Sequence, residues 1–240
     1  MLVVMNTNTI PTSIEIQELI TGGDRSAKPA ASIIVLHGLG ADGSDFVPIA
    51  QELDLAAVGP VRFVFPSAPV RPVTVNGGYA MRAWYDIFPP SQDPRQPRQE
   101  DEAGLRDSLG LVQQLLERET LRGTAPSRTV LMGFSQGCAM TLLAGLRAPT
   151  RLAGLVALSG YLPLSDHTAQ EMPPANRDVP VFMAHGELDE VVVPERGLAA
   201  RDVLKALGNK VDWHSYPMGH EVCRQEIDDL NAWLLGVLAQ

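Results

Sequence analysis

The amino-acid sequence predicts an α/β protein built on a mostly parallel, doubly wound sheet with helices on both faces. Strand-like runs alternate with helix-like stripes along the chain, an order typical of βαβ units. Most of these runs are continuously apolar, as expected for strands buried on both faces of a parallel sheet. A chain of 240 residues is long enough for one large domain and short for two. We therefore expect a loose N-terminal end at residues 1–13 and a single domain over residues 14–240.

The first elements surround a glycine-rich loop. Residues 14–19 alternate partly between apolar and polar side chains, which indicates an edge strand. Residues 32–37 form a β-branched run that predicts a buried core strand. A helix over residues 45–53 and a strand over residues 61–65 are expected to follow.

Residues 66–100 differ in character from the rest of the chain. They hold seven prolines, a glycine pair at residues 77–78, and the aromatic side chains Tyr79, Trp84, Tyr85 and Phe88. Such a stretch cannot form one helix, and it is longer than ordinary connections. We expect a functional loop excursion that walls a binding cleft.

The second half of the chain repeats the strand-helix alternation. Leucine and valine recur at helical spacing from residue 105 to residue 116, which predicts a helix ending near Gly123. Further strands are expected at 129–134, 152–159, 179–184 and 211–216, and further helices at 138–147, at about 198–207 and at about 227–237. The connection 161–178 carries Pro173 and Pro174 and is too short for a folded lid of several helices.

Composition narrows the classes of function. The net charge is −9 and the 19 Lys and Arg residues are scattered, so we expect no nucleic-acid partner. The N-terminus lacks the basic start and apolar length of a signal peptide, and no run reaches the roughly 20 apolar residues of a membrane helix. Cys138 and Cys223 each lie in a predicted helix and need not pair, since a chain of this size requires no disulfide. These features favour a cytoplasmic protein without stable membrane insertion.

The sequence from Gly133 to Gly137 reads GFSQG between a predicted strand and a predicted helix. This is the pattern of a nucleophile elbow, G-x-S-x-G. A serine on so tight a turn has strained backbone geometry and needs small neighbours two residues away on each side. Ser135 is therefore the candidate nucleophile.

A serine nucleophile needs a base to take its proton and an acid to orient that base. In α/β hydrolases these follow the serine in the order Asp or Glu, then His. Three carboxylates follow the strand at 179–184, namely Glu187, Asp189 and Glu190, and the residues alone leave the choice open.

The base should follow the last strand. His220 stands there beside a glycine, directly before the terminal helix. His37 and His185 also end strands before glycines, but both precede the position that this topology requires. The five histidines show no spacing typical of a metal site, so no metal is expected.

The loop at residues 38–43, GLGADG, offers a different reading, that of a dinucleotide-binding oxidoreductase. Its G-x-G-x-x-G pattern requires an acidic residue about 20 positions on, at the end of the next strand. No acid appears there before Asp86, which disfavours this reading. The loop can instead present a backbone N–H toward the serine, as half of an oxyanion hole.

Several blocks together resemble the phospholipase/carboxylesterase family of α/β hydrolases, which includes bacterial carboxylesterases and acyl-protein thioesterases. The blocks are HGLGADG at 37–43, GGYAM at 77–81, WYD at 84–86, GFSQG at 133–137, LD at 188–189, VVVP at 191–194 and MGHE at 218–221. The resemblance runs from about residue 32 to 238. Cys138 departs from it, because the family usually carries a second glycine there; a small thiol should fit, and it could be a sensitive thiol near the site.

The resemblance implies an α/β-hydrolase fold without a large lid domain and a Ser-His-Asp triad of Ser135, His220 and Asp189. It also implies that the N–H groups of Leu39 and Gln136 are the oxyanion donors. The expected function is a carboxylesterase for short to medium acyl esters, with thioesterase or lysophospholipase activity as the alternative. We expect a small-molecule ester substrate, no cofactor, and a monomer or homodimer. Trp84 either contacts the acyl group or packs the excursion against the sheet.

Overall fold

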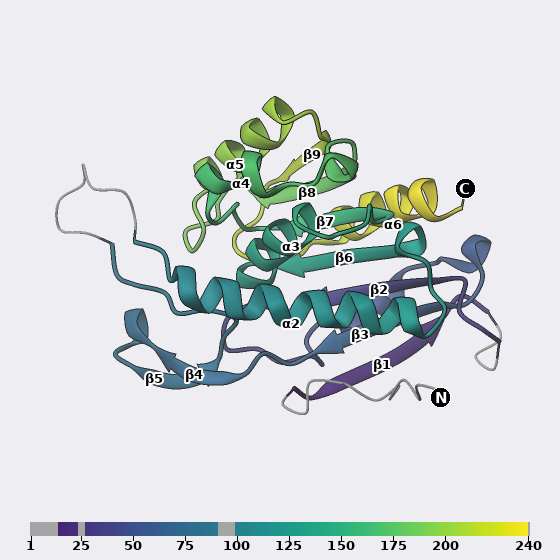
Figure 1. The fold of residues 1–240 in the computed structure, drawn as a ribbon, viewed down its shortest axis with the longest axis horizontal. Coiled ribbons are helices and arrows are strands. Elements are labelled where there is room, and N and C mark those ends of the chain that lie inside the picture. Colours follow the sequence, from purple (N-terminus) through teal and green to yellow (C-terminus); the bar gives the residue numbers. More distant parts are fainter. Residues whose placement is uncertain (1–13, 24–26, 91–98, 240) are drawn as a thin grey trace, which may run out of the picture.

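The computed structural model describes residues 14–23, 27–90 and 99–239, and the predicted loose end at 1–13 lies outside them. Seven strands form one sheet in the order β1-β3-β2-β6-β7-β8-β9 (Figure 1). β1 is antiparallel to β3, and all other neighbours are parallel. The strands are β1 Ile16–Thr21, β2 Ala31–Leu36, β3 Val61–Pro66, β6 Thr129–Phe134, β7 Gly154–Leu158, β8 Pro180–Gly186 and β9 Lys210–Tyr216. The predicted mostly parallel sheet, with residues 14–19 contributing to an edge strand, is confirmed.

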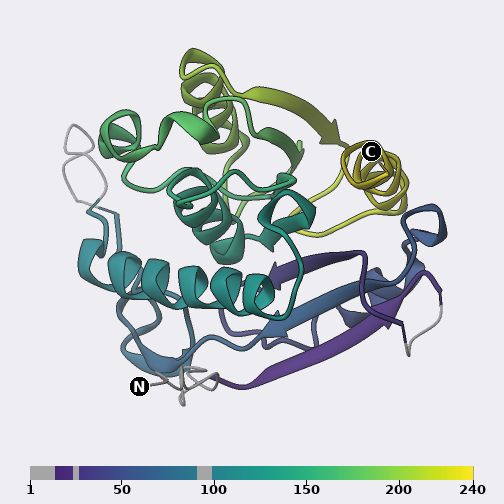
Figure 2. The same cartoon turned by 45° about the vertical axis from the view of Figure 1, so that its right-hand side comes forward.

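Helices cover both faces of this sheet. The helices are α1 Val47–Glu52, α2 Glu102–Leu121, α3 Gln136–Leu146, α4 Ser165–Glu171, α5 Pro194–Ala206 and α6 Arg224–Leu238. Buried side chains of α2, α3 and α5 pack on one face with Ile34 and Leu36 of β2. Those of α1 and α6 pack on the other face with Ile33 and Val35, so alternate residues of one strand enter different cores. Figure 2 shows α6 across the sheet from α2 and α3.

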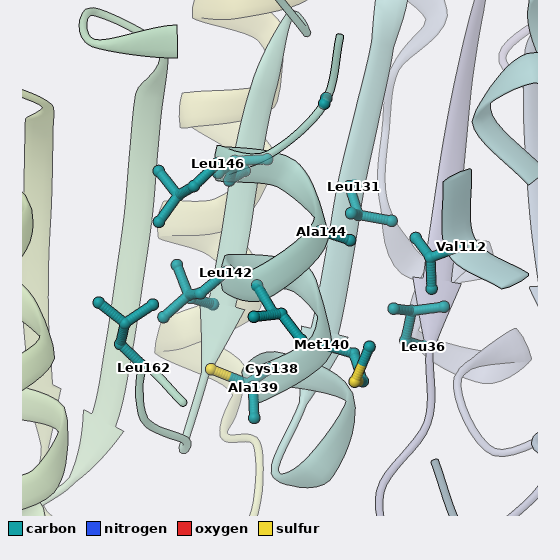
Figure 3. Packing of buried hydrophobic residues seen from close by; sticks show 14 of the residues in the cluster. Leu36, Val112, Leu131, Cys138, Ala139, Met140, Leu142, Ala144, Leu146 and Leu162 are labelled. Atoms are coloured by element: carbon teal, nitrogen blue, oxygen red, sulfur yellow. The ribbon is translucent and has the colours of Figure 1, made fainter. Parts of the chain in front are cut away.

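The central helix α3 is buried along its whole length, from Gln136 to Leu146. Its side chains contact the β-strands on one side and α2 on the other, and Figure 3 shows Ala144 beside Leu131 and Met140 beside Leu36. A helix that is apolar all round can be stable only when it is enclosed in this way. The nucleophile elbow therefore rests on a helix with no solvent-facing side.

The described part of the segment 66–100 contains a small hairpin that the sequence did not predict. Strands β4 Val70–Val73 and β5 Tyr79–Arg82 pair in an antiparallel register, with a 3-10 turn at Thr74–Asn76 between them. Gly77 and Gly78 adopt positive φ angles of 68° and 78° and close the turn. Proline is rare in strands, so the prolines of this segment argued against a strand in the sequence. β4 accommodates Pro72 because it belongs to a two-stranded ribbon.

The connection between β7 and β8 contains one seven-residue helix, α4, and a 3-10 turn at Pro174–Asn176. This agrees with the prediction that no lid of several helices is inserted there. Other predicted boundaries shift by a few residues: α3 begins at Gln136 rather than at residue 138, and Cys223 precedes α6 instead of lying within it.

Candidate active site

Ser135 occupies the sharp turn between β6 and α3. Its backbone angles are φ 55° and ψ −115°, a region that L-residues rarely adopt. A Cβ on Gly137 would stand 2.0 Å from the carbonyl oxygen of Leu36, and one on Gly133 would stand 2.2 Å from that of Gly137. Both neighbours must therefore be glycine, which is the physical reason for the G-x-S-x-G spacing.

The structure brings Ser135, His220 and Asp189 together at the carboxyl edge of the sheet. Ser135 follows β6, Asp189 follows β8, and His220 follows β9. The Ser135 Oγ lies 2.9 Å from His220 Nε2, and His220 Nδ1 lies 2.7 Å from the Asp189 carboxylate. Three loops distant in sequence thus form one continuous hydrogen-bonded chain.

The Asp189 carboxylate is buried and held by its own loop. One oxygen accepts the N–H groups of Val191 and Val192 at 2.9 and 2.8 Å, while the other oxygen faces His220. Glu187 and Glu190 are exposed, and Glu187 accepts a hydrogen bond from Ser215. Of the three carboxylates left open by the residues alone, the structure places only Asp189 against the histidine.

The loop at residues 38–40 lies beside the nucleophile, because a Cβ on Gly38 would stand 3.4 Å from the Ser135 Cβ. Gly40 fixes this loop by donating its N–H to the carbonyl of Arg82 at 2.9 Å. Gln136 is the first residue of α3, where an N–H has no acceptor inside the helix. Within the described residues, the N–H groups of Leu39 and Gln136 have no protein acceptor. Both are therefore free to bind a negative oxygen.

Trp84 does not line a cleft. Its side chain is 0% exposed, and its indole N–H donates to the carbonyl of His37 at 3.0 Å. Its backbone N–H donates to the Gln136 side chain at 2.8 Å. The expectation that Trp84 contacts an acyl group is corrected by this burial, which matches the packing alternative.

Two histidines set aside during sequence reasoning lie next to the site. His37 accepts the Ala68 N–H through Nε2 at 2.9 Å, and its Nδ1 donates to Gly38 at 2.7 Å. Burial lowers the pKa of His37, which keeps the ring neutral. His185 donates from Nε2 to Val192 at 2.7 Å, tying β8 to the loop of the acid. The sequence feature that could have pointed to both residues is a histidine at the end of a predicted strand, immediately before a glycine.

Cys138 lies in the first turn of α3 and is buried against Gly160 (Figure 3). Burial raises the pKa of its thiol well above the usual range, so the thiolate is not formed near neutral pH. Both cysteines are free. The side chain fits its position as expected, and its burial disfavours reaction with reagents in solution.

The nucleophile and its histidine are both partly exposed. Ser135 is half-buried and the His220 side chain is 16% exposed. A cavity of about 680 Å³ lies elsewhere, between the C-terminal half of α2 and the segment 147–152 after α3, and none of the predicted site residues lines it. Access to the serine therefore comes from the carboxyl edge of the sheet.

No helix in the described ranges is long and apolar enough to cross a membrane. The same residues contain no group of three or more His, Cys, Asp or Glu side chains arranged to hold a metal ion.

Comparison with known proteins identifies the fold. Residues 20–237 match the model of the family described as phospholipase/carboxylesterase. Acyl-protein thioesterase 1 of Mycosarcoma maydis is 41% identical over 238 residues, covering 93% of this chain and 98% of that protein. Carboxylesterase SOBER1 of Arabidopsis thaliana is 32% identical over 203 residues, covering 84% and 88%.

The crystal structure of Arabidopsis thaliana SOBER1 superposes with a TM-score of 0.80 at 31% identity, over 87% of this chain and 99% of that one. The sheet order and the elbow described above are thus those of an α/β-hydrolase fold. This chain belongs to the phospholipase/carboxylesterase family, and it is a hydrolase of the α/β-hydrolase fold.

Proposed function

We propose that this protein is a serine carboxylesterase that hydrolyses short to medium acyl esters through an acyl-enzyme on Ser135. The observation that carries the proposal is the hydrogen-bonded chain from Ser135 Oγ through His220 to Asp189, at 2.9 and 2.7 Å. Such a chain has the geometry of a nucleophile, a general base and an orienting acid.

In the proposed reaction, His220 Nε2 takes the hydroxyl proton as Ser135 Oγ bonds to the ester carbonyl carbon. The carbonyl oxygen becomes an oxyanion that accepts the N–H groups of Leu39 and Gln136. His220 then gives its proton to the departing alcohol as the ester bond breaks. Water attacks the acyl-enzyme with the same histidine as base, releasing the carboxylic acid and restoring Ser135. The cycle needs no cofactor, since every proton moves within the triad.

The preference for short to medium acyl chains follows from the open site. The connection after β7 carries only α4 and one 3-10 turn, so it does not enclose a long chain. Exposed apolar side chains flank the acid, with Leu188 and Val191 about 70% exposed. Such side chains can contact a short acyl group at the surface.

Ser135→Ala should leave the fold intact, since among the described residues the half-buried hydroxyl hydrogen-bonds to His220 alone. The turnover number should fall by roughly 10⁴-fold or more, to what oxyanion stabilisation and binding supply alone. Hydrolysis of a short p-nitrophenyl ester measures this, with circular dichroism to confirm folding. An organophosphonate should label Ser135 in the wild type, and labelling of another serine would overturn the assignment.

Thioester hydrolysis is the second candidate, favoured because similar proteins of several fungi are named acyl-protein thioesterase 1. The same triad can attack either carbonyl. Oxygen esters and thioesters with identical acyl chains of 2 to about 16 carbons would separate the two functions. A kcat/KM for the thioester series that exceeds the ester series at every length would replace the carboxylesterase assignment.

A further inference from the structure

The buried Trp84 contacts both segments that carry the oxyanion donors, and it does so through different atoms. Its indole N–H binds the carbonyl of His37, which immediately precedes the loop bearing Leu39. Its backbone N–H binds the side chain of Gln136, whose own N–H is the second donor. The two donors lie on separate segments, Leu39 in the loop after β2 and Gln136 at the start of α3 after β6.

The Gln136 side chain is locked at both ends. Its carbonyl oxygen accepts the Trp84 N–H at 2.8 Å, and its amide group donates to the carbonyl of Tyr85 at 2.8 Å. Glutamine on the first turn of a helix normally faces solvent, but here the residue is only 3% exposed. The oxygen and the amide nitrogen of this side chain each make one hydrogen bond, to residues 84 and 85, and together they fix the start of α3 against them.

Trp84 is itself anchored from two further sides. Ser108 of α2 donates its hydroxyl to the Trp84 carbonyl. The indole packs against the His37 ring, with the ring centroids 5.4 Å apart. The His37 ring in turn bonds Ala68 and Gly38, so the position of Trp84 is over-determined. A side chain held this firmly can fix the spacing of the groups that bind to it.

We propose that Trp84 is a positioning residue that sets the separation of the Leu39 and Gln136 N–H groups, and so tunes the oxyanion hole without touching substrate. The inference rests on the proposed function. Preorganised donors stabilise a transition state only when they already point at the developing oxyanion. A small displacement of either donor therefore lowers transition-state binding more than substrate binding.

Two variants test the Trp84–His37 and Trp84–Gln136 hydrogen bonds separately. Trp84→Phe removes the indole N–H and loosens the Leu39 side, while its backbone N–H still binds Gln136. Gln136→Met keeps the backbone donor and removes both side-chain hydrogen bonds. Trp233→Phe on α6 is the control, since Trp233 packs on Phe182 rather than on the elbow. Trp233 is only partly buried whereas Trp84 is fully buried, so this control reports the effect of a Trp-to-Phe change away from the site.

The measurements are kcat and KM for a short p-nitrophenyl ester and the inhibition constant of an alkyl trifluoromethyl ketone. This ketone forms a tetrahedral adduct: a bond forms from Ser135 Oγ to the carbonyl carbon, the proton passes to His220, and the carbonyl oxygen becomes an oxyanion. We expect Trp84→Phe and Gln136→Met each to lower kcat roughly 10- to 100-fold, with KM within about twofold. Affinity for the ketone should fall by the same factor as kcat, and the pH profile should keep its midpoint because the triad is unchanged. Trp233→Phe should change none of these values.

Retention of kcat and of ketone affinity within twofold in a folded Gln136→Met or Trp84→Phe protein would overturn the proposal and leave Trp84 with a packing role only. If Trp84→Phe does not fold, Gln136→Met alone decides. Failure of the proposed function has a different signature, in which Ser135→Ala keeps its activity or the wild type hydrolyses no ester.

Discussion

Asp189 performs two tasks with separate oxygens, and this explains why one carboxylate among three suits the role. One oxygen stabilises the 189–192 turn by accepting two N–H groups, and the other faces His220. The side chain is fully buried, so its negative charge is not screened by water. Neither Glu187 nor Glu190 meets these conditions, because both are exposed.

Asp189→Asn should therefore preserve the conformation of the 189–192 turn but abolish most of the catalytic activity. The asparagine carbonyl oxygen can still accept the N–H groups of Val191 and Val192, but its amide cannot accept the His220 Nδ1 proton. We expect kcat to fall by roughly 10⁴-fold, since the imidazole is left in the wrong tautomer. Ester hydrolysis and thermal unfolding measure the two effects. Glu187→Gln is the matched control, and an equal loss of activity there would show that the acid is wrongly assigned.

Glu226, in the first turn of α6, is a buried carboxyl group that the proposed reaction does not use. It is 0% exposed, and neither of its oxygens makes a hydrogen bond of normal geometry among the described residues, although the Cys223 backbone N–H is near enough to oppose the effect of burial in part. Burial raises the pKa of Glu226 to about 8, from 4.5 for an ordinary glutamate. The folded protein therefore keeps this group protonated at a pH where the unfolded chain has lost the proton.

This difference makes stability depend on pH. Between pH 4.5 and 8 unfolding releases the proton, so the free energy of unfolding falls as pH rises, by about 1.4 kcal/mol per pH unit from this group. Glu226→Gln, which cannot ionise, should flatten this slope and raise Tm most near pH 8. Thermal unfolding from pH 5 to pH 8 measures it, with the exposed Glu117→Gln as control. An unchanged slope in Glu226→Gln would mean that Glu226 is ionised in the folded protein.

At the scale of elements, the elbow depends on how closely α3 approaches β2 and β6. A Cβ added to Gly137 would clash with the backbone of Leu36. A Cβ added to Gly110, on α2, would meet no atom within 4 Å. The two glycines are therefore a matched pair, one required by packing and the other not.

Gly137→Ala should lower the free energy of unfolding by roughly 3 kcal/mol or more, because backbone atoms cannot move aside for the new methyl group. Gly110→Ala should raise it by roughly 0.5–1 kcal/mol, since alanine is the better helix former. Chemical denaturation of both variants measures these changes. A Gly137→Ala protein with wild-type stability and activity would show that the elbow tolerates a wider turn.

At the scale of the whole molecule, the open site follows from what the fold leaves uncovered. Helices cover both faces of the sheet, whereas among the described residues loops, the β4–β5 hairpin and α4 lie at its carboxyl edge (Figure 1). The connection after β7 carries only α4 and one 3-10 turn, which is too short for a lid of several helices.

Hydrolysis of a medium-chain ester should therefore rise smoothly with total substrate and level off at the solubility limit. Enzymes with mobile lids instead gain activity when the substrate forms an interface, because the interface opens the lid. Initial rates measured below and above the solubility limit test this. A sharp increase above the limit would show that residues 161–178 or 66–100 act as a lid.

The sequence by itself determined the strands of the main sheet, most of the helices, the fold class and two members of the candidate triad, Ser135 and His220. Apolar periodicity encodes strands and helices locally, and Ser135 and His220 each stand at a motif or chain position that topology fixes. Asp189 needed a family resemblance, because three nearby carboxylates satisfy the same spacing.

Only the tertiary structure decided which polar groups meet and which side chains are enclosed. Trp84 contacts His37, 47 residues before it, and Gln136, 52 residues after it, and no local pattern reports such pairings. The β4–β5 hairpin was hidden for a similar reason, since its strands are short and contain proline. Burial depends on the packing of distant segments, whereas a sequence motif describes only neighbours along the chain. This is why the sequence indicated the chemistry of the site, and the fold alone showed how its donors are held.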